Sequence, residues 1–256
     1  MIQARHVGLI AGATLVGGLL VVLALWEWER SIPASRHFMA GVRLADRNKP
    51  EAALVEFRRA AEKDPRDVET RIELANTLSW LKRYDEALAE CGMAVSLDPL
   101  SPRAHMSLGL ALKSERRWGE AIAEFRQAIR LDSHYRAPRH QVCSTLMYAG
   151  RLDEAVAECR RNIRLDPRGI GVGLVLARAL EKQGKLDQAI AAGRQVQRID
   201  RSYLGSEVAR LLYAKSDYAG AWREVHRLQA RRAFPLGDRD KEFLAKLQSK
   251  MPEPRQ

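Results

Sequence analysis

The apolar positions of this chain repeat at an interval of 34 residues, and alanine marks the repeat most clearly. The recurring alanines are Ala53, Ala87, Ala121, Ala155 and Ala189. Aspartate keeps the same interval, at Asp64, Asp98, Asp132, Asp166 and Asp200, and three of these residues precede a proline. A helix pair of this length cannot bury its apolar face alone. The interval therefore predicts a stack of helical hairpins with a shared core.

Two further positions of the repeat indicate how the helices of each hairpin meet. A small residue stands where the first helix meets the second, as Gly41, Ala75, Gly109, Cys143 and Ala177. Leucine follows three residues later, as Leu44, Leu78, Leu112, Leu146 and Leu180. Small residues let two helices approach closely, and the leucines fill the seam between them. With repeats starting at Ala34, Val68, Pro102, Arg136 and Ile170, the fold class is predicted to be all-α.

The turn inside each repeat supports the same register. Residues 83–87 and 150–155, for example, combine a residue that ends the first helix, a large aromatic or aliphatic residue, and acidic residues in the first turn of the next helix. With this turn, the small positions and the Asp-Pro step, the chain resembles the tetratricopeptide repeat (TPR) family over about residues 34 to 235. The resemblance implies a right-handed superhelical solenoid that serves as a recognition platform. The chain departs from the family where a large aromatic often stands near the start of the first helix. The residues there are His37, Arg71, His105, Arg139 and Gly173.

The repeats define the domain organisation. Five copies occupy residues 34–203, and a degenerate sixth copy, two residues shorter, occupies 202–235. Its key positions hold Ala209, Leu212, Tyr218, Ala221 and Leu228. In the tail, residues 236–256, the apolar Phe243, Leu244 and Leu247 have helical spacing. This spacing suits a capping helix over the last hairpin, which solenoids commonly need.

An uncharged apolar run of about 20 residues, 7–26, precedes the repeats. As a helix it would be about 30 Å long, which matches the hydrocarbon core of a bilayer. Trp26 and Trp28 stand at its end, where amphipathic rings favour the headgroup level. Residues 1–30 are therefore expected to be a tail and a single transmembrane anchor. A cleaved signal peptide is the alternative, but the run is long and no clear small-x-small site follows it.

Gly8 and Gly12 in this run form a small-xxx-small step, which suits contact with another membrane helix, although glycine is common in such helices. The orientation stays open. Arg30, Arg36 and Arg43 after the run outnumber Arg5 before it, and this favours a cytosolic repeat domain. Long domains cross largely regardless of charge, however. A short N-terminal head in a bacterial protein more often leaves the body outside the cytosol, so we expect a bacterial inner-membrane protein with periplasmic repeats.

The formal net charge of +11 comes mostly from arginines scattered through the repeats. It favours anionic partners or an anionic membrane surface. The alternative is an ordinary solvated face, because acidic residues are interspersed in nearly every repeat. No polybasic run adjoins the anchor and no nucleic-acid motif occurs, so we expect no nucleic-acid partner.

The three cysteines fit core positions of the repeat. Cys91 and Cys159 stand where Phe57 and Phe125 occur in other copies, and Cys143 fills a small-residue position. Free cysteine behaves as a small buried apolar residue. A disulfide between Cys143 and Cys159 is an alternative only in an oxidising compartment.

The sequence carries no catalytic motif. His134 and His140 are six residues apart, which is not the spacing that places two metal ligands on one helical face. Gly169, Gly171 and Gly173 do not form a phosphate loop and instead indicate a weak helix start. We therefore expect no catalytic residue, no metal and no cofactor, and a protein that is not an enzyme.

The first helix of each repeat is expected to line a groove that suits an extended peptide or a partner helix. The candidate contact residues are Ile72, Asn76, Trp80, Met106, Leu110, His140, Ser144, Tyr148, Leu174 and Arg178. Leu110 and Leu174 could instead pack between helices. One family mode grips a C-terminal carboxylate with lysines and asparagines, but only Asn76 matches its positions, so that function is not expected.

The sequence thus predicts a non-catalytic, membrane-anchored scaffold or adaptor that binds a protein or peptide partner. Two alternatives remain. One is a chaperone-like assembly factor for exported or membrane-protein clients, and the other is a binder of anionic surfaces that acts through its arginines.

Overall fold

The computed structural model describes residues 33–199, 205–230 and 238–251, and within them the chain forms thirteen α-helices and no strand. The first helices of the five repeats are α2 (Ala34–Asp46), α4 (Val68–Trp80), α6 (Pro102–Ser114), α8 (Arg136–Tyr148) and α10 (Ile170–Lys182). The second helices are α3 (Pro50–Lys63), α5 (Tyr84–Leu97), α7 (Trp118–Leu131), α9 (Leu152–Leu165) and α11 (Leu186–Ile199). The remaining helices are α12 (Gly205–Ala214), α13 (Tyr218–Ala230) and α14 (Asp238–Lys250). The all-α class is confirmed, and each first helix begins at the predicted residue.

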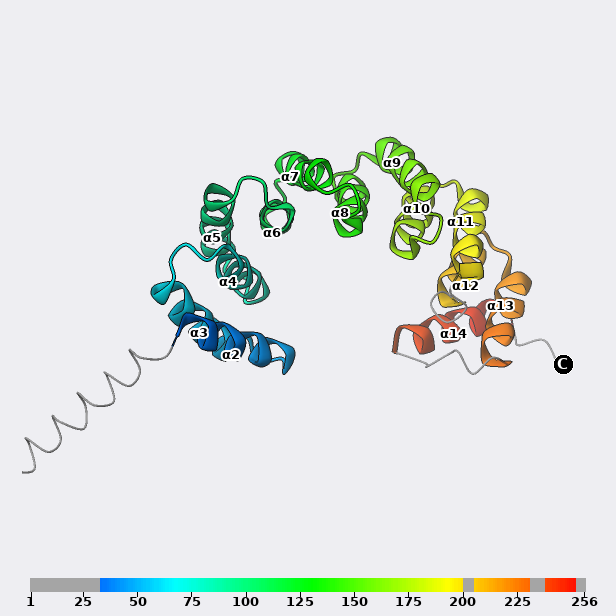
Figure 1. Ribbon diagram of the computed structural model, residues 1–256. Coiled ribbons are helices and arrows are strands. Elements are labelled where there is room, and N and C mark those ends of the chain that lie inside the picture. Colours follow the sequence, from blue (N-terminus) through cyan, green and yellow to red (C-terminus); the bar gives the residue numbers. More distant parts are fainter. Residues whose placement is uncertain (1–32, 200–204, 231–237, 252–256) are drawn as a thin grey trace, which may run out of the picture. The chain divides into compact units, whose positions relative to one another are not determined.

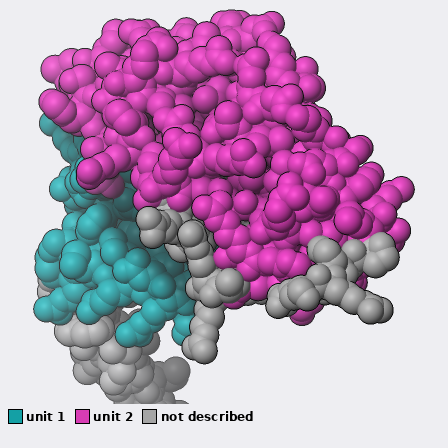
Figure 2. Space-filling model, turned by 90° about the vertical axis from the view of Figure 1, so that its right-hand side faces the viewer, with its two compact units in different colours: residues 1–99 teal, residues 100–256 magenta. Residues whose placement is uncertain are grey.

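The chain divides into two compact units, residues 1–99 and residues 100–256, which are coloured separately in Figure 2. In unit 1, α2 pairs with α3, α4 pairs with α5, and α3 also contacts α4 (Figure 1). In unit 2, each helix from α6 to α14 contacts the next one along the chain, and α8 also contacts α10. Each unit is therefore built from helical hairpins in chain order, as the repeat requires.

The repeating aspartates fold the turn between one hairpin and the next. Asp64, Asp132 and Asp166 each follow a second helix directly, and each accepts a hydrogen bond at Oδ1 from the backbone N–H two residues later. The N···O distances are 3.1, 2.8 and 3.2 Å. An aspartate side chain that bonds its own backbone in this way stabilises a turn without a backbone partner. This explains why the residue recurs once per repeat.

The turn inside each hairpin requires one residue whose backbone is in the left-handed conformation, with a positive φ. That residue is Asn48, Lys82, Arg116, Gly150, Gly184 or Ser216, all with φ between 58° and 76°. Only glycine adopts this conformation without a steric penalty, so the other four positions hold a residue under mild strain.

The core follows the predicted small positions. All five repeating alanines, from Ala53 to Ala189, are fully buried. A Cβ added at Gly41 would lie 2.7 Å from the ring of Phe57, and one at Gly109 would lie 2.6 Å from the ring of Phe125. Both phenylalanines are buried, so the missing side chain of each glycine is the space that the aromatic ring fills.

Helices α12 and α13 form a further hairpin in unit 2, and α14 contacts both of them. Phe243 and Leu247 of α14 are buried, and Trp222 of α13 donates a hydrogen bond from Nε1 to the carbonyl oxygen of Met251 at 3.0 Å. The apolar spacing read from the tail thus corresponds to a helix that covers the last hairpin.

The predicted anchor at residues 7–26, with Gly8 and Gly12, lies outside the described residues. Of the helices in residues 33–199, 205–230 and 238–251, none has both the length and the apolarity needed to cross a membrane.

Candidate functional site

The predicted groove residues differ widely in exposure. In unit 1, Trp80 is 50% exposed and Asn76 is also exposed, whereas Ile72 is buried at 2%. In unit 2, Tyr148 is 57% exposed and Arg178 is exposed, while Leu110, His140 and Leu174 are half-buried.

Three of these candidates do not offer the accessible surface expected of them. Ile72, Met106 and Ser144 are at most 8% exposed because their side chains face neighbouring helices, and they serve the core. These three side chains therefore offer little surface for direct contact with a partner. Leu110 and Leu174, which the sequence left undecided, keep part of their surface accessible.

A lysine links two first helices of unit 2 beside the exposed Tyr148. Lys113 of α6 donates hydrogen bonds from Nζ to Oε1 of Gln141 at 2.7 Å and to Oγ of Ser144 at 3.1 Å. The same Nζ lies 5.4 Å from the centroid of the Tyr148 ring, within the range of a cation–π interaction. Burial lowers the pKa of Lys113.

Besides Lys113, the side chain of Trp118 also contacts the Tyr148 ring. Its ring stacks on Trp118 at the start of α7, with 6.4 Å between centroids and 22° between planes. Lys113 and Trp118 therefore fix an aromatic side chain that still presents more than half of its surface to solvent. A rigid, exposed aromatic of this kind is typical of a protein-contact residue.

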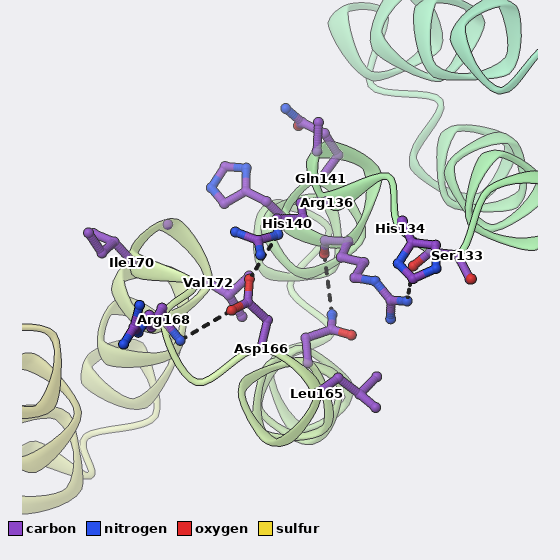
Figure 3. A pocket seen from close by; sticks show the side chains of 15 residues that line it. Ser133, His134, Arg136, His140, Gln141, Leu165, Asp166, Arg168, Ile170 and Val172 are labelled. Carbon is purple, nitrogen blue, oxygen red and sulfur yellow. Dashed lines mark hydrogen bonds and ion pairs between the residues drawn. The ribbon is translucent and has the colours of Figure 1, made fainter. Parts of the chain in front are cut away.

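A cavity of about 540 Å³ opens in unit 2 at the start of α8 and α10 and the end of α9 (Figure 3). Its polar lining comes from Ser133, His134, Arg136, Arg139, His140, Gln141, Asn162, Asp166 and Arg168. Its other lining residues are Ala137, Leu165, Gly169, Ile170, Gly171 and Val172. Three arginines face a single carboxylate among these residues, so the cavity is cationic.

Two glycines at the start of α10, Gly169 and Gly171, line the cavity. Gly169 is the N-cap residue and no side chain caps this helix, unlike α4 and α6, where Asp67 and Ser101 accept a backbone N–H. A Cβ at Gly171 would lie 3.0 Å from Cδ2 of His140, so the glycine lets the imidazole lie close to the helix. At the start of α10 the backbone N–H of Ile170 donates to the carbonyl oxygen of Arg168, while Gly169 and Gly171 line the cavity.

A repeating ion pair is missing at this cavity. In the first three repeats the residue that replaces the family aromatic bonds a glutamate 19 residues later: His37 with Glu56 at 2.8 Å, Arg71 with Glu90 at 2.7 Å, and His105 with Glu124 at 2.6 Å. In the fourth repeat the equivalent residues are Arg139 and Glu158. Within the described residues they form no such pair.

Arg139 instead donates from Nη2 to the carbonyl oxygen of Ser133 at 2.7 Å. Arg71 makes both kinds of contact at once, because its Nη2 and Nε also reach the carbonyl oxygen of Pro65. Arg139 therefore keeps the backbone contact of its counterpart and lacks the carboxylate. Its remaining guanidinium donors belong to a half-buried side chain that lines the cavity.

The other charges of the cavity are more exposed. Nε of Arg136 lies 3.4 Å from Oδ2 of Asp166, and the two side chains point toward one another in Figure 3. Arg168 lies on the other side of Asp166, to which its backbone N–H donates. Burial, and then the positive charge of Lys113, hold the pKa of His140 below its ordinary value of 6.5, so this imidazole is neutral at pH 7.

Asn162 forms part of the cavity wall at a position where Ala60, Ala94 and Ala128 stand in other repeats. It is 3% exposed, and its Nδ2 donates to the carbonyl oxygen of Arg139 and to Sγ of Cys143, both at 3.4 Å. The amide thereby ties α9 to the backbone of α8 directly below Arg139.

Cys143 and Cys159 are fully buried thiols that form no disulfide, and Cys91 is likewise a buried thiol. A hydrogen bond with Cys143 and burial together raise the pKa of the Cys159 thiol. The Cys159 thiol is therefore protonated at neutral pH and is a core residue, not a nucleophile.

Of the ten residues predicted from the sequence, only His140 lines this cavity. The arginines were missed because the sequence showed them as scattered surface charge. The signal that could have located them was present in two places, the substitution of the family aromatic by Arg139 and the glycines at the start of α10.

The structure defines a protein built from repeated helical hairpins. Family models described as tetratricopeptide repeat match residues 44–110, 102–135 and 144–203, which together make up more than half of the chain. The chain belongs to the tetratricopeptide repeat family. No relative was found among curated protein sequences.

Several solved structures share the fold. PilW, described as a widely conserved type IV pilus biogenesis factor, is 21% identical with a TM-score of 0.67, over 82% of this chain and 98% of PilW. The pilF protein of Pseudomonas aeruginosa is 20% identical with a TM-score of 0.63, over 83% and 97% of the two chains. YrrB, described as a TPR protein with an unusual peptide-binding site, is 19% identical with a TM-score of 0.50, over 77% and 93%. At these identities the likeness shows the fold alone.

Proposed function

We propose that this protein is a non-catalytic, membrane-anchored scaffold whose repeats hold a partner protein in a membrane-associated assembly. The observation that carries the proposal is the pair of exposed aromatic residues, Trp80 and Tyr148, at the same position of two first helices. Large aromatic side chains that remain half exposed on a folded surface are enriched at protein contacts.

Tyr148 supports this proposal further because it is already ordered. Lys113 and Trp118 hold its ring in place, so little side-chain entropy is lost when a partner packs against it. Two neighbours of the same fold are described as a pilus biogenesis factor and as a peptide-binding TPR protein. Their likeness extends to the fold, and it is compatible with a scaffold that binds through the first helices.

The membrane part of the proposal rests on the uncharged run of about 20 residues before the repeats. We propose a single-pass protein of a bacterial inner membrane with its repeats in the periplasm. A cleaved signal peptide and a cytosolic repeat domain are the alternatives that a test must separate.

The test compares full-length protein with two variants, Trp80→Ala and Tyr148→Ala, and with their combination. Each strain is cross-linked, extracted in mild detergent, and analysed by quantitative mass spectrometry. We expect one stoichiometric partner, whose capture falls at least tenfold in the double variant, which corresponds to about 1.4 kcal/mol. Arg194→Gln, an exposed change on α11, is the control and should leave capture unchanged.

Full retention of the partner by a folded double variant would contradict the proposed contact surface. Capture of many unrelated clients in place of one stoichiometric partner would instead support the chaperone-like alternative. Helicity measured by circular dichroism must match the parent protein in either case.

A further inference from the structure

We propose that the cavity at the start of α8 and α10 binds an acidic segment of the partner protein, with a carboxylate among the arginines and an apolar side chain beside Leu165 and Ile170. The inference rests on the proposed function, because it assigns a chemistry to the partner that the scaffold holds. Neither Trp80 nor Tyr148 lines this cavity.

The first argument is the charge of the cavity. Arg136, Arg139 and Arg168 line it, and Asp166 is the single carboxylate among its lining residues. Asp166 is occupied by Arg136 and by the backbone N–H of Arg168. Arginine recognises carboxylates through paired N–H donors, so a partner carboxylate would complement the charge that remains.

The second argument is that the guanidinium groups of Arg139 and Arg168 have N–H donors available for a ligand. Arg71, in the equivalent position of the second repeat, uses its guanidinium on both Glu90 and the Pro65 carbonyl. Arg139 bonds only the Ser133 carbonyl, with one nitrogen. The guanidinium of Arg168 makes no hydrogen bond to any residue that the structure describes. Both arginines can therefore donate to a ligand without breaking an existing ion pair.

The third argument is the geometry of α10. Its first turn borders the cavity, carries no acidic residue and has no side-chain cap. The N-terminal end of a helix favours an anion, and Gly169 and Gly171 contribute backbone without a side chain to the cavity lining at this end. The cavity, the unpaired arginine donors and the helix start thus converge on the same type of group.

The apolar part of the lining selects a peptide over other anions. Leu165 is 61% exposed at the rim, and Ile170 and Val172 also line the cavity. A free phosphate leaves these surfaces uncovered, whereas a peptide can cover them with a neighbouring side chain. An anionic membrane surface fits less well, because Arg139 is half-buried in a recess and cannot reach a flat layer of headgroups.

The test uses the full-length protein in detergent micelles and a fluorescently labelled peptide in which glutamate alternates with leucine, followed by fluorescence anisotropy. We expect saturable binding, and at least tenfold weaker binding of a matched peptide in which glutamine replaces every glutamate. We also expect Arg139→Met and Gly171→Leu to weaken binding of the acidic peptide at least tenfold, the first by removing donors and the second by displacing the His140 imidazole that lines the cavity. Arg168→Met, a change in an exposed loop, should weaken it to a smaller extent.

Arg194→Met removes an exposed arginine from α11, outside the cavity, and is the matched control with unchanged affinity. Equal binding of the two peptides would overturn the inference. It would also be overturned if Arg168→Met and a folded Arg139→Met both bound like the parent protein, or if inorganic phosphate or phosphatidylglycerol vesicles displaced the peptide as well as an excess of unlabelled acidic peptide does. The proposed function fails separately, when the parent protein captures no stoichiometric partner, whatever the peptide assay shows.

Discussion

Single residues in this chain carry local backbone tasks that repeat once per hairpin. Asp64, Asp132 and Asp166 each fold the turn after a second helix through the side chain, and the residue two positions before each second helix takes up a positive φ. The first task explains why aspartate recurs at one position, whereas residues of several types fill the positive-φ position.

A substitution at the positive-φ position provides a first prediction. Gly150 has φ 76°, and a Cβ there would meet nothing within 4 Å, so Gly150→Ala adds backbone strain without a clash. We expect a loss of about 1 kcal/mol in the free energy of unfolding, measured by urea denaturation.

Gly119→Ala is the matched control for this change. Gly119 is also open within 4 Å, but it lies in the first turn of α7 and its φ is negative. Alanine there should be neutral or stabilising because it favours the helix. Equal destabilisation by both substitutions would refute the role of the positive φ.

A second prediction at this scale concerns His140 and pH. Its pKa is lowered in the folded protein, so the unfolded chain binds more protons below about pH 6.5, and stability must rise with pH in that window. As the pH falls from 7.5 to 5, the parent protein should lose more stability than His140→Gln, as followed by thermal melting at each pH. Parallel pH profiles of the two proteins would contradict the assignment.

At the scale of the helix pair, one position on the first helix is matched in size to one on the second. Glycine at position 41 or 109 faces phenylalanine, and Cys143 faces Cys159 in the fourth repeat. In the second repeat the corresponding positions hold Ala75 and Cys91, and both residues are buried. The distance between the two helices limits the combined volume of the two side chains. A large residue on one helix therefore requires a small residue on the other.

This size matching predicts a compensating pair of substitutions. Gly109→Ala should destabilise the protein by about 1 to 3 kcal/mol, because the new Cβ would lie 2.6 Å from the Phe125 ring. Phe125→Cys alone should also destabilise it, by leaving a cavity. The double variant restores the type of contact found in the second repeat, and should be less destabilised than the sum of the single changes. Additive losses in urea unfolding would refute the pairing.

At the scale of the whole molecule, we predict that the apolar run before the repeats anchors the protein in the membrane. We predict that full-length protein stays in the membrane fraction during carbonate and high-salt extraction and is released only by detergent. A shortened chain that begins at Ser31 should be soluble and helical by circular dichroism. Release of the full-length protein without detergent would contradict the anchor, and protease access from the periplasmic side would determine the orientation.

The sequence by itself determined the fold class, the family and the start of each first helix, because those depend on periodic requirements that every copy satisfies in the same way. The small core positions, the aspartate turns and the seam leucines are each visible as a residue type at a fixed interval. Repetition gives such signals a strength that a single helix lacks.

Only the tertiary structure decided which side chains are accessible and where the charges gather. Ile72, Met106 and Ser144 occupy first-helix positions that the pattern assigned to a groove, yet neighbouring helices cover them. Arg139 and Arg71 occupy the same position of the repeat, but Arg71 bonds a glutamate, whereas Arg139 bonds a backbone carbonyl and lines a cavity. The difference depends on residues contributed by three helices, α8, α9 and α10. Contacts between separate helices have no fixed spacing along the chain, and that is why the periodic pattern could not reveal them.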